Sequence, residues 1–311
     1  MIQTTSHQGV TWTDVQDPSK EDMDTLARSY PFHHLNLDDC ISKIQLTKID
    51  EHGEYVFVVV HFPRHDEATG LIVPVQVSFF LGEGYLVTVH GGDLPTIDDF
   101  FRQASSNPES REEIMGKSAV FLLYRLLDRI IDDLFPLLDK IENELDDIDD
   151  KVYDEKVFAA FETSRLQRRI ASFRRLIIRL KRLGVDLPPK VQPFTTQDLS
   201  AYFSDIRDHI EKAFETLDEA KETIDIYVDT DFILNSEKTN KVLAILTIIY
   251  TLTIPVTVIG TVYGMNVLLP GGLQSGSWTF FGQYTTLIVL LFLALVPSLL
   301  MSYYFRRLGW V

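Results

Sequence analysis

Residues 242–305 read VLAILTIIYTLTIPVTVIGTVYGMNVLLPGGLQSGSWTFFGQYTTLIVLLFLALVPSLLMSYYF, a run of 64 residues without Asp, Glu, Lys, Arg or His. Within it, residues 242–262 and 284–305 are predominantly apolar segments of 21 and 22 residues. At about 1.5 Å rise per residue, either helix is long enough to cross a hydrocarbon core of about 30 Å. The stretch therefore predicts two membrane-spanning helices with an outer loop at residues 263–283, and it divides the chain into residues 1–240 and 241–311.

A polar turn, Tyr263-Gly264-Met265-Asn266, lies at the end of the first predicted span. In lipid every backbone amide must be bonded within its own segment, so non-helical backbone at this depth is tolerated only against protein or water. A glycine followed closely by an asparagine therefore suits the mouth of a water-filled path. The alternative is a plain loop between two anchor helices.

Charge is segregated along the chain. All 45 acidic residues precede Lys241, against 26 of the 29 basic residues, so residues 1–240 carry a formal net charge of −19. Such an excess would repel the phosphates of nucleic acid, so we expect no nucleic-acid partner. It suits a domain exposed to metal cations or basic partners, or one that is simply kept soluble.

Other sequence features exclude several classes of protein. Cys40 is the single cysteine, which excludes a disulfide framework and a thiolate metal site and suits a reducing cytoplasm. Residues 1–13 contain no apolar core of signal-peptide length, so we expect residues 1–240 to stay on the cytoplasmic side. No nucleophile–base constellation, phosphate loop or metal-ligand motif stands out, so we expect neither an enzyme nor an organic cofactor.

Strand patterns dominate the early part of the chain. After a polar lead, residues 19–30 predict a helix, and residues 32–40, FHHLNLDDC, predict a turn-rich bridge. Four runs rich in Val, Ile, Phe and Tyr predict strands at residues 43–50, 54–62, 73–81 and 85–90. From Leu94 onward only helical patterns follow. Residues 1–240 therefore predict an α/β domain around a mostly antiparallel sheet.

Two helices of opposite charge are predicted next. Apolar residues at helical spacing predict one helix over residues 117–153, and residues 128–155 hold twelve acidic and three basic residues. We interpret this acidic face as collecting cations or as a solvated surface. The following helix is basic from Arg165 to Arg182 and is expected to end before Pro188. It predicts a basic collar near anionic headgroups or the acidic helices, or an amphipathic helix on the membrane surface.

A long helix is predicted to lead into the membrane. Thr195-Thr196-Gln197-Asp198 resembles a capping box, and no convincing breaker follows before the first span. Unbroken from Gln197 to Val262, this helix has 66 residues and is about 100 Å long. Its apolar positions alternate steps of four and three, the spacing of a packed seam: Ile206, Ile210, Ala213, Leu217, Ala220, Ile224 and Tyr227. A rod of this length needs neighbours, and a ring of identical rods supplies them.

A second regular line continues along the first span. It repeats steps of three and four and carries one asparagine and three threonines: Asn240, Leu243, Thr247, Tyr250, Ile254, Thr257 and Thr261. Small hydroxyl and amide groups on one face suit a water-filled axis between helices. They also suit tight helix packing.

An ion in this region would find no charged ligand. A dehydrated dication needs several oxygen ligands, commonly carboxylates, and residues 242–305 contain no carboxylate. An ion that passes is therefore expected to keep its water, with oxygens at the Gly264-Met265-Asn266 mouth bonding the hydration shell. The positive-inside rule places both termini in the cytoplasm, because basic residues flank the spans: Lys238, Lys241, Arg306 and Arg307.

The turn Tyr263-Gly264-Met265-Asn266, at the end of the penultimate membrane helix, resembles the signature of the CorA family of divalent-cation transport proteins. Residues 32–39 are similar to the family's segment before its first sheet strands, and Asn240 to Asn266 has the family's spacing from pore-entry asparagine to signature asparagine. The resemblance implies a funnel-shaped homopentamer in a cell membrane, with five first spans around one axis and the second spans outside. It also implies transport of Mg²⁺, often with Co²⁺ and Ni²⁺, and closure when Mg²⁺ binds between cytoplasmic domains.

The resemblance also implies regulatory sites and marks one departure. By position, Asp39 and Asp205 are similar to the family's inter-subunit sensing pair, and Asp229 to an acidic residue farther down the stalk.

Many members continue after the signature with Met-Pro-Glu-Leu, whereas this chain has VLLPGG at residues 267–272 and no acid up to Gln283. A zinc-transporting branch shares the Gly-Met-Asn turn, so a Zn²⁺ transporter of the same architecture is the alternative. A non-transporting membrane-anchored sensor or scaffold is the second alternative.

Overall fold

The computed structural model describes residues 1–42, 45–152, 159–265, 268–271, 276, 278–282 and 284–307. The chain divides into two compact units, Met1–Asp231 and Phe232–Val311. One helix, α8 (Ser200–Gly264), contributes residues to both units. The predicted order of an α/β domain, a long helix and a C-terminal apolar helix is confirmed.

The first unit is built around a six-stranded sheet. Its strands are β1 (Ile2–His7), β2 (Val10–Gln16), β3 (Lys48–Glu51), β4 (Tyr55–Asp66), β5 (Leu71–Gly82) and β6 (Tyr85–His90). They follow the order β1-β2-β6-β5-β4-β3, and β2–β6 is the parallel pair among antiparallel neighbours. The predicted mostly antiparallel sheet is confirmed. The strand predicted at residues 43–50 is shorter, since β3 begins at Lys48 and residues 43 and 44 lie outside the described residues.

The predicted polar lead is wrong, because residues 2–16 form the β1–β2 hairpin. Gln8 and Gly9 have φ angles of 47° and 83°, so the tight turn between the strands uses two left-handed residues. The hairpin adds to the sheet because Trp12 and Val15 are fully buried on its opposite faces. The edge strand β1 shows few apolar residues, which hides the alternation in the sequence.

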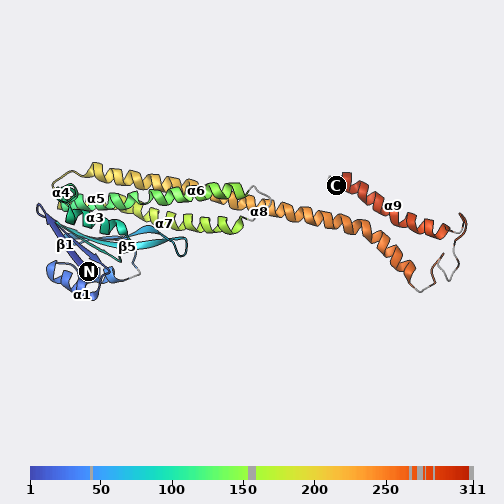
Figure 1. The fold of residues 1–311 in the computed structure, drawn as a ribbon, viewed down its shortest axis with the longest axis horizontal. Coiled ribbons are helices and arrows are strands. Elements are labelled where there is room, and N and C mark those ends of the chain that lie inside the picture. Colours follow the sequence, from blue (N-terminus) through green and yellow to red (C-terminus); the bar gives the residue numbers. More distant parts are fainter. Residues whose placement is uncertain are drawn as a thin grey trace. The chain divides into compact units, whose positions relative to one another are not determined.

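Helices cover both faces of the sheet (Figure 1). On one face, α1 (Lys20–Ser29) and α2 (His34–Ile41) bury Leu26 and Leu37 against a cluster that contains Phe57 and Phe80. The turn-rich bridge predicted at residues 32–40 is therefore wrong for most of its length. The His33 side chain caps α2 by accepting the amide of Leu35, and the burial of Leu37 stabilises a helix with weak local signals.

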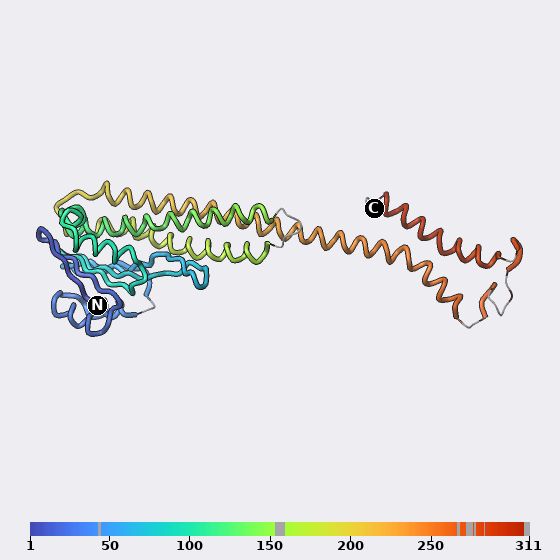
Figure 2. Tube along the Cα trace, viewed as in Figure 1, coloured from blue at the N-terminus to red at the C-terminus, as the bar shows by residue number. Residues whose placement is uncertain are grey.

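The opposite face is covered by the larger helical layer. Its elements are α3 (Pro95–Ser106), α4 (Pro108–Met115), α5 (Ala119–Asp132), α6 (Phe135–Val152), α7 (Ala160–Val191), the 3₁₀ turn η1 (Gln192–Phe194) and the first part of α8. Figure 2 shows α6, α7 and this part of α8 running side by side. The single helix predicted over residues 117–153 is wrong, because the chain breaks at Asp133 and Leu134. Pro136 lacks the amide that would continue α5 into α6.

Helix α7 continues past the two prolines that were predicted to end it. Pro188 and Pro189 lie in its last turn, where they cannot donate the backbone bonds to the carbonyls of Gly184 and Val185. Leu187 and Val191 are buried in the core on either side of the prolines. Packing therefore holds one more helical turn than the local sequence predicts.

Helix α8 begins at Ser200 and runs for 65 residues. The capping box predicted at residues 195–198 is wrong in detail: Thr195 Oγ1 accepts the amide of Gln197, and Asp198 Oδ1 accepts the amide of Ser200. The predicted apolar seam is confirmed, since six of its seven residues are buried in the core and Tyr227 packs against it.

The second unit holds the end of α8 and α9 (Thr285–Arg307). Both helices are long and apolar enough to cross a membrane, with mean hydropathy of 2.4 and 2.3 in their most apolar windows. Almost all of this apolar surface is exposed in the single chain. Ser298 Oγ on α9 donates a 3.0 Å hydrogen bond to the Leu252 carbonyl on α8, so the two helices form a hairpin.

Candidate functional site

The apolar part of α8 has one side that faces α9. Its half-buried positions recur at helical spacing: Ala244, Ile248, Thr251, Leu252, Pro255 and Ile259. The bond from Ser298 to the Leu252 carbonyl lies on this side. The side is therefore the contact between the two apolar helices.

The polar line predicted from the sequence lies on the other side of α8. All seven of its members are exposed: Asn240, Leu243, Thr247, Tyr250, Ile254, Thr257 and Thr261. At 100° per residue, their mean direction is about 120° away from the side that meets α9. Packing against α9 therefore does not account for the line, which leaves a neighbouring chain, water or lipid to face it.

Two of the three threonines on this line are set up as acceptors. Thr247 Oγ1 donates to the Leu243 carbonyl at 2.7 Å, and Thr257 Oγ1 donates to the Thr253 carbonyl at 2.9 Å. Because each hydroxyl proton is used within the helix, the oxygen keeps its lone pairs for a partner outside it. Water around a cation points its hydrogens outward, so such a face suits a hydrated cation better than an anion.

The predicted mouth lies at the end of α8. Gly264 is the last residue of the helix, and a Cβ added there would meet no atom within 4 Å. The Tyr263 hydroxyl donates to the Pro270 carbonyl at 3.2 Å, and the Met265 side chain is exposed. Asn266 lies outside the described residues. The described part of the turn is thus tied back by Tyr263, while no described residue of the chain leaves room only for glycine at Gly264.

Asp39, the first of the predicted cytoplasmic acids, is already paired. Its carboxylate lies 2.7 Å from Lys48 Nζ and accepts a 2.7 Å hydrogen bond from Gln45 Nε2. Burial lowers the pKa of Lys48, but the hydrogen bonds to Asp39 and Asp50 outweigh burial and raise the pKa above its ordinary value. A cation at Asp39 would therefore compete with a firmly charged lysine.

Asp205 gathers with Asp128 of α5 and with His209, one turn farther along α8. One ligand atom from each residue lies within 4.8 Å of the others. Burial raises the pKa of Asp128, and the carboxylates of Asp132 and Asp205 raise it further. A cation between these groups would relieve the repulsion that this shift reports. We call Asp128, Asp205 and His209 the α5–α8 cluster.

Sequence reasoning found one member of the α5–α8 cluster and missed the other two. The spacing of Asp205 and His209 by four residues was a usable signal, whereas Asp128 joins them only through the packing of α5 against α8. Asp229 is exposed on α8, and Asp39 belongs to the layer on the other face of the sheet. A single chain therefore does not bring the three predicted acids together.

A second polar cluster, which the sequence did not indicate, joins Asp14, His90 and Asp98. His90 is fully buried, and its Nε2 lies 3.3 Å from Asp14 Oδ1 and 3.8 Å from Asp98 Oδ1. Its Nδ1 accepts the amide of Gly92 at 3.1 Å, which assigns the proton of the neutral ring to Nε2. In that form the ring has no lone pair for a cation between the carboxylates, so the cluster is a hydrogen-bond network.

The basic helix α7 belongs to the core of the first unit. Its apolar stripe, which includes Ile170, Phe173 and Ile177, is fully buried, so the predicted alternative of a membrane-surface amphipathic helix is wrong. Some of its basic residues pair with acids of α6 and α8: Arg169 with Glu144, Arg174 with Asp218, and Lys181 with Glu211. The predicted proximity of basic and acidic helices is confirmed.

Comparison with known proteins identifies similar chains. The family model described as CorA-like Mg²⁺ transporter protein matches residues 7–307. The putative metal ion transporter YfjQ of Bacillus subtilis is 29% identical over 259 residues, which cover 82% of this chain and 78% of that protein. The cobalt/magnesium transport protein CorA of Thermotoga maritima is 27% identical over 258 residues, which cover 82% of this chain and 73% of that protein.

Solved structures match the fold. The complete CorA magnesium transporter of Methanocaldococcus jannaschii aligns with a TM-score of 0.76 at 21% identity, covering 99% of this chain and 94% of that chain. The soluble domain of the same transporter aligns with a TM-score of 0.60 at 20% identity, covering 73% of this chain and 89% of that chain. At sequence identities of 21% and 20%, this similarity shows a shared fold.

Proposed function

This chain belongs to the CorA-like Mg²⁺ transporter protein family, and we propose that it carries divalent metal cations across a cell membrane, with Mg²⁺ as the main substrate and Co²⁺ and Ni²⁺ as further substrates. Family membership makes it an ion-transport protein and not an enzyme. The observation that carries the proposal is the uncharged face of α8 along Asn240–Thr261, which is exposed and turned away from α9. A transport path needs such a polar wall with no partner inside its own chain.

The path is completed by further copies of the chain. The exposed apolar surfaces of α8 and α9 need cover, and a homopentamer supplies it, with the α8 helices inside and the α9 helices between them and lipid. In this arrangement the seven residues of the polar line face the axis. The partners are therefore the chain itself and membrane lipid, with no role for nucleic acid.

The ion passes with its water. The threonine oxygens can accept hydrogen bonds from a hydration shell but cannot replace the carboxylates that a bare dication needs. Mg²⁺ gives up its shell reluctantly, so a path of neutral acceptors suits it. Tyr263, Gly264, Met265 and Asn266 form the selective mouth at the outer end.

Cytoplasmic Mg²⁺ closes the pore. Regulatory ions bind between neighbouring subunits at Asp39 and Asp205, and farther along the stalk at Asp229. The α5–α8 cluster supplies Asp128 and His209 beside Asp205, so the subunit that provides Asp205 offers three groups to one ion or to its water. Lys238, Lys241, Arg306 and Arg307 keep both termini in the cytoplasm.

Flux into liposomes that contain only this protein tests the proposal. Mg²⁺, Co²⁺ and Zn²⁺ are offered side by side, with and without a pH gradient. We expect Mg²⁺ influx without a proton gradient, loss of influx in Asn266→Ala, and weaker inhibition by internal Mg²⁺ in Asp205→Asn with basal flux retained. Absence of flux for every cation in the assembled wild-type protein would leave the non-transporting scaffold in its place.

A Zn²⁺ transporter of the same architecture is the second candidate. Two observations favour it: the segment of residues 267–283 lacks acidic residues that would concentrate Mg²⁺, and His209 supplies an imidazole, which suits Zn²⁺ better than Mg²⁺. Zn²⁺ flux that excess Mg²⁺ does not inhibit would select this candidate.

A further inference from the structure

Five arginines of α7 form a stripe that makes no ion pair with an acid of the described residues. Arg165, Arg168, Arg175, Arg179 and Arg182 are exposed and recur at spacings of three, four and seven residues. Within the part of the chain that the structure describes, none of them makes an ion pair. This is unexpected in a unit that carries a large excess of acidic residues, because nearby carboxylates would normally pair with them.

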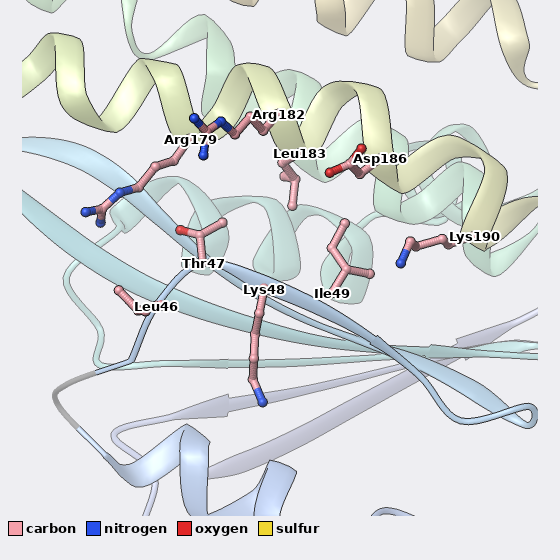
Figure 3. Close-up of a pocket in the computed structure, with 9 residues that line it drawn as sticks. All are labelled: Leu46, Thr47, Lys48, Ile49, Arg179, Arg182, Leu183, Asp186 and Lys190. Carbon is pink, nitrogen blue, oxygen red and sulfur yellow. The ribbon is translucent and has the colours of Figure 1, made fainter.

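One end of this stripe borders a pocket of about 350 Å³ between α7 and the segment that leads into β3. Arg179, Arg182, Asp186 and Lys190 line it from α7, and Thr47 lines it from the facing segment (Figure 3). Apolar side chains of Ile49 and Leu183 complete its wall. With Lys48, the pocket combines four cationic side chains, one carboxylate, one hydroxyl and a small apolar surface.

The cationic groups of the pocket differ in what they already bind. Lys48 also belongs to the lining, but its amine pairs with Asp39 and Asp50 and points away from α7 in Figure 3. Lys190 pairs with Glu51 at 2.9 Å, near the pocket's rim. Arg179 and Arg182 make neither an ion pair nor a hydrogen bond to any residue that the structure describes.

We propose that this pocket binds a phosphate-bearing anion, and that Arg179 and Arg182 are its main ligands. Guanidinium groups one helical turn apart can each donate two hydrogen bonds to a phosphate, which is a geometry that lysine cannot offer. The site shares no residue with the α8 face or the α5–α8 cluster, so it goes beyond the transport function proposed above.

The size and wall of the pocket select among phosphate-bearing molecules. A volume of about 350 Å³ exceeds what inorganic phosphate needs, and Ile49 and Leu183 offer apolar contact to a second part of the ligand. A nucleoside phosphate fits this combination better than pyrophosphate or a glycerol phosphate headgroup. Asp186 lines the same pocket about one helical turn beyond Arg182, and its charge repels a bare anion. It therefore weakens binding and restricts which anions fill the site.

The proposal is tested by calorimetric titration of the full chain in detergent, in EDTA, with ATP, pyrophosphate and glycerol 3-phosphate as probes. We expect ATP to bind more tightly than pyrophosphate and glycerol 3-phosphate to bind weakly. Arg179→Gln with Arg182→Gln should weaken ATP binding at least tenfold, because two charge-assisted contacts are lost. Asp186→Asn should tighten it several-fold, because a repulsive charge is removed.

The matched control is Arg165→Gln with Arg168→Gln. It removes the same charge from the same stripe, but Arg168 is eleven residues from Arg179, about 16 Å along the helix and beyond a Debye length of about 8 Å at physiological salt. The control should change ATP affinity less than twofold. Equal losses in both double variants, or no ATP binding by a wild-type protein that transports cations, would overturn the site and leave the transport function standing.

Discussion

Replacing Thr247 with valine should slow cation flux, whereas replacing Thr251 with valine should not. Both threonines donate their hydroxyl proton to the carbonyl four residues earlier, each at 2.7 Å. Thr247 is exposed on the polar line, and Thr251 is half-buried on the side that meets α9. Valine keeps the shape of threonine, so the two variants lose the same intrahelical bond and differ in whether an acceptor leaves the proposed path.

The expected magnitude follows from the number of acceptors removed. A hydrogen bond between protein and water-bound ion contributes a net of about 0.5–1.5 kcal/mol. In a homopentamer the substitution removes five such acceptors at one level of the path, so the barrier rises by about 2.5 kcal/mol at the lower limit. At about 1.4 kcal/mol per tenfold, Thr247→Val should reduce Mg²⁺ flux by about 60-fold.

The assay is Mg²⁺ influx into liposomes, measured with an internal fluorescent indicator and normalised to the amount of assembled protein. Thr251→Val serves as the matched control and should stay within about twofold of the wild type. Equal flux in the two variants would refute the assignment of the polar line to the ion path. A loss confined to Thr251→Val would move the path to the side of α8 that faces α9.

Three further outcomes are expected. Gly264→Ala should leave the stability of the chain unchanged, because an added Cβ meets no atom within 4 Å. It should still reduce flux at least tenfold, because the proposed mouth needs that space for neighbouring copies or the ion's water. Urea unfolding and liposome flux are measured together, and a destabilised variant would contradict the reasoning. Glu144→Gln should lower the free energy of unfolding by about 1–3 kcal/mol, because the Arg169 side chain is only 3% exposed and would lose its charged partner. The same change at the exposed Glu142, the control, should leave the free energy of unfolding almost unchanged. Asp22→Asn should lower that free energy by about 0.5 kcal/mol at pH 7, and the difference should shrink in acid. Hydrogen bonds from Ser19 lower the pKa of Asp22 below 3.8, so its contribution is complete above that value and is lost as the pH falls through the folded-state pKa. A difference that did not shrink as the pH fell below 3.8 would count against the cap.

Local sequence was a good guide where one short-range pattern dominates. The strands β4, β5 and β6 were predicted from their β-branched and aromatic residues, since both faces of these strands are buried. It was a poor guide where burial is one-sided or a break depends on one residue. The β1–β2 hairpin was missed because polar side chains hide its alternation, and the break before α6 was missed because Pro136 lies within an otherwise continuous helical pattern.

The candidate site also has a part that local sequence predicted and a part that it did not. The polar line from Asn240 to Thr261 was visible in the sequence, because it depends only on the helical repeat. The α5–α8 cluster was not, because Asp128 is 77 residues from Asp205 along the chain and joins it through core packing.

The sequence by itself determined that this protein has two apolar helices, an uncharged polar line on the first of them and a strongly acidic first unit. These follow from composition and from the 3.6-residue repeat, which act within a single segment. Only the tertiary structure decided that the polar line is turned away from α9, that Asp128 and His209 stand beside Asp205, and that Arg179 and Arg182 line a pocket without an ion pair to any described residue. These depend on which helix faces pack together, and burial of apolar surface between distant segments settles that choice.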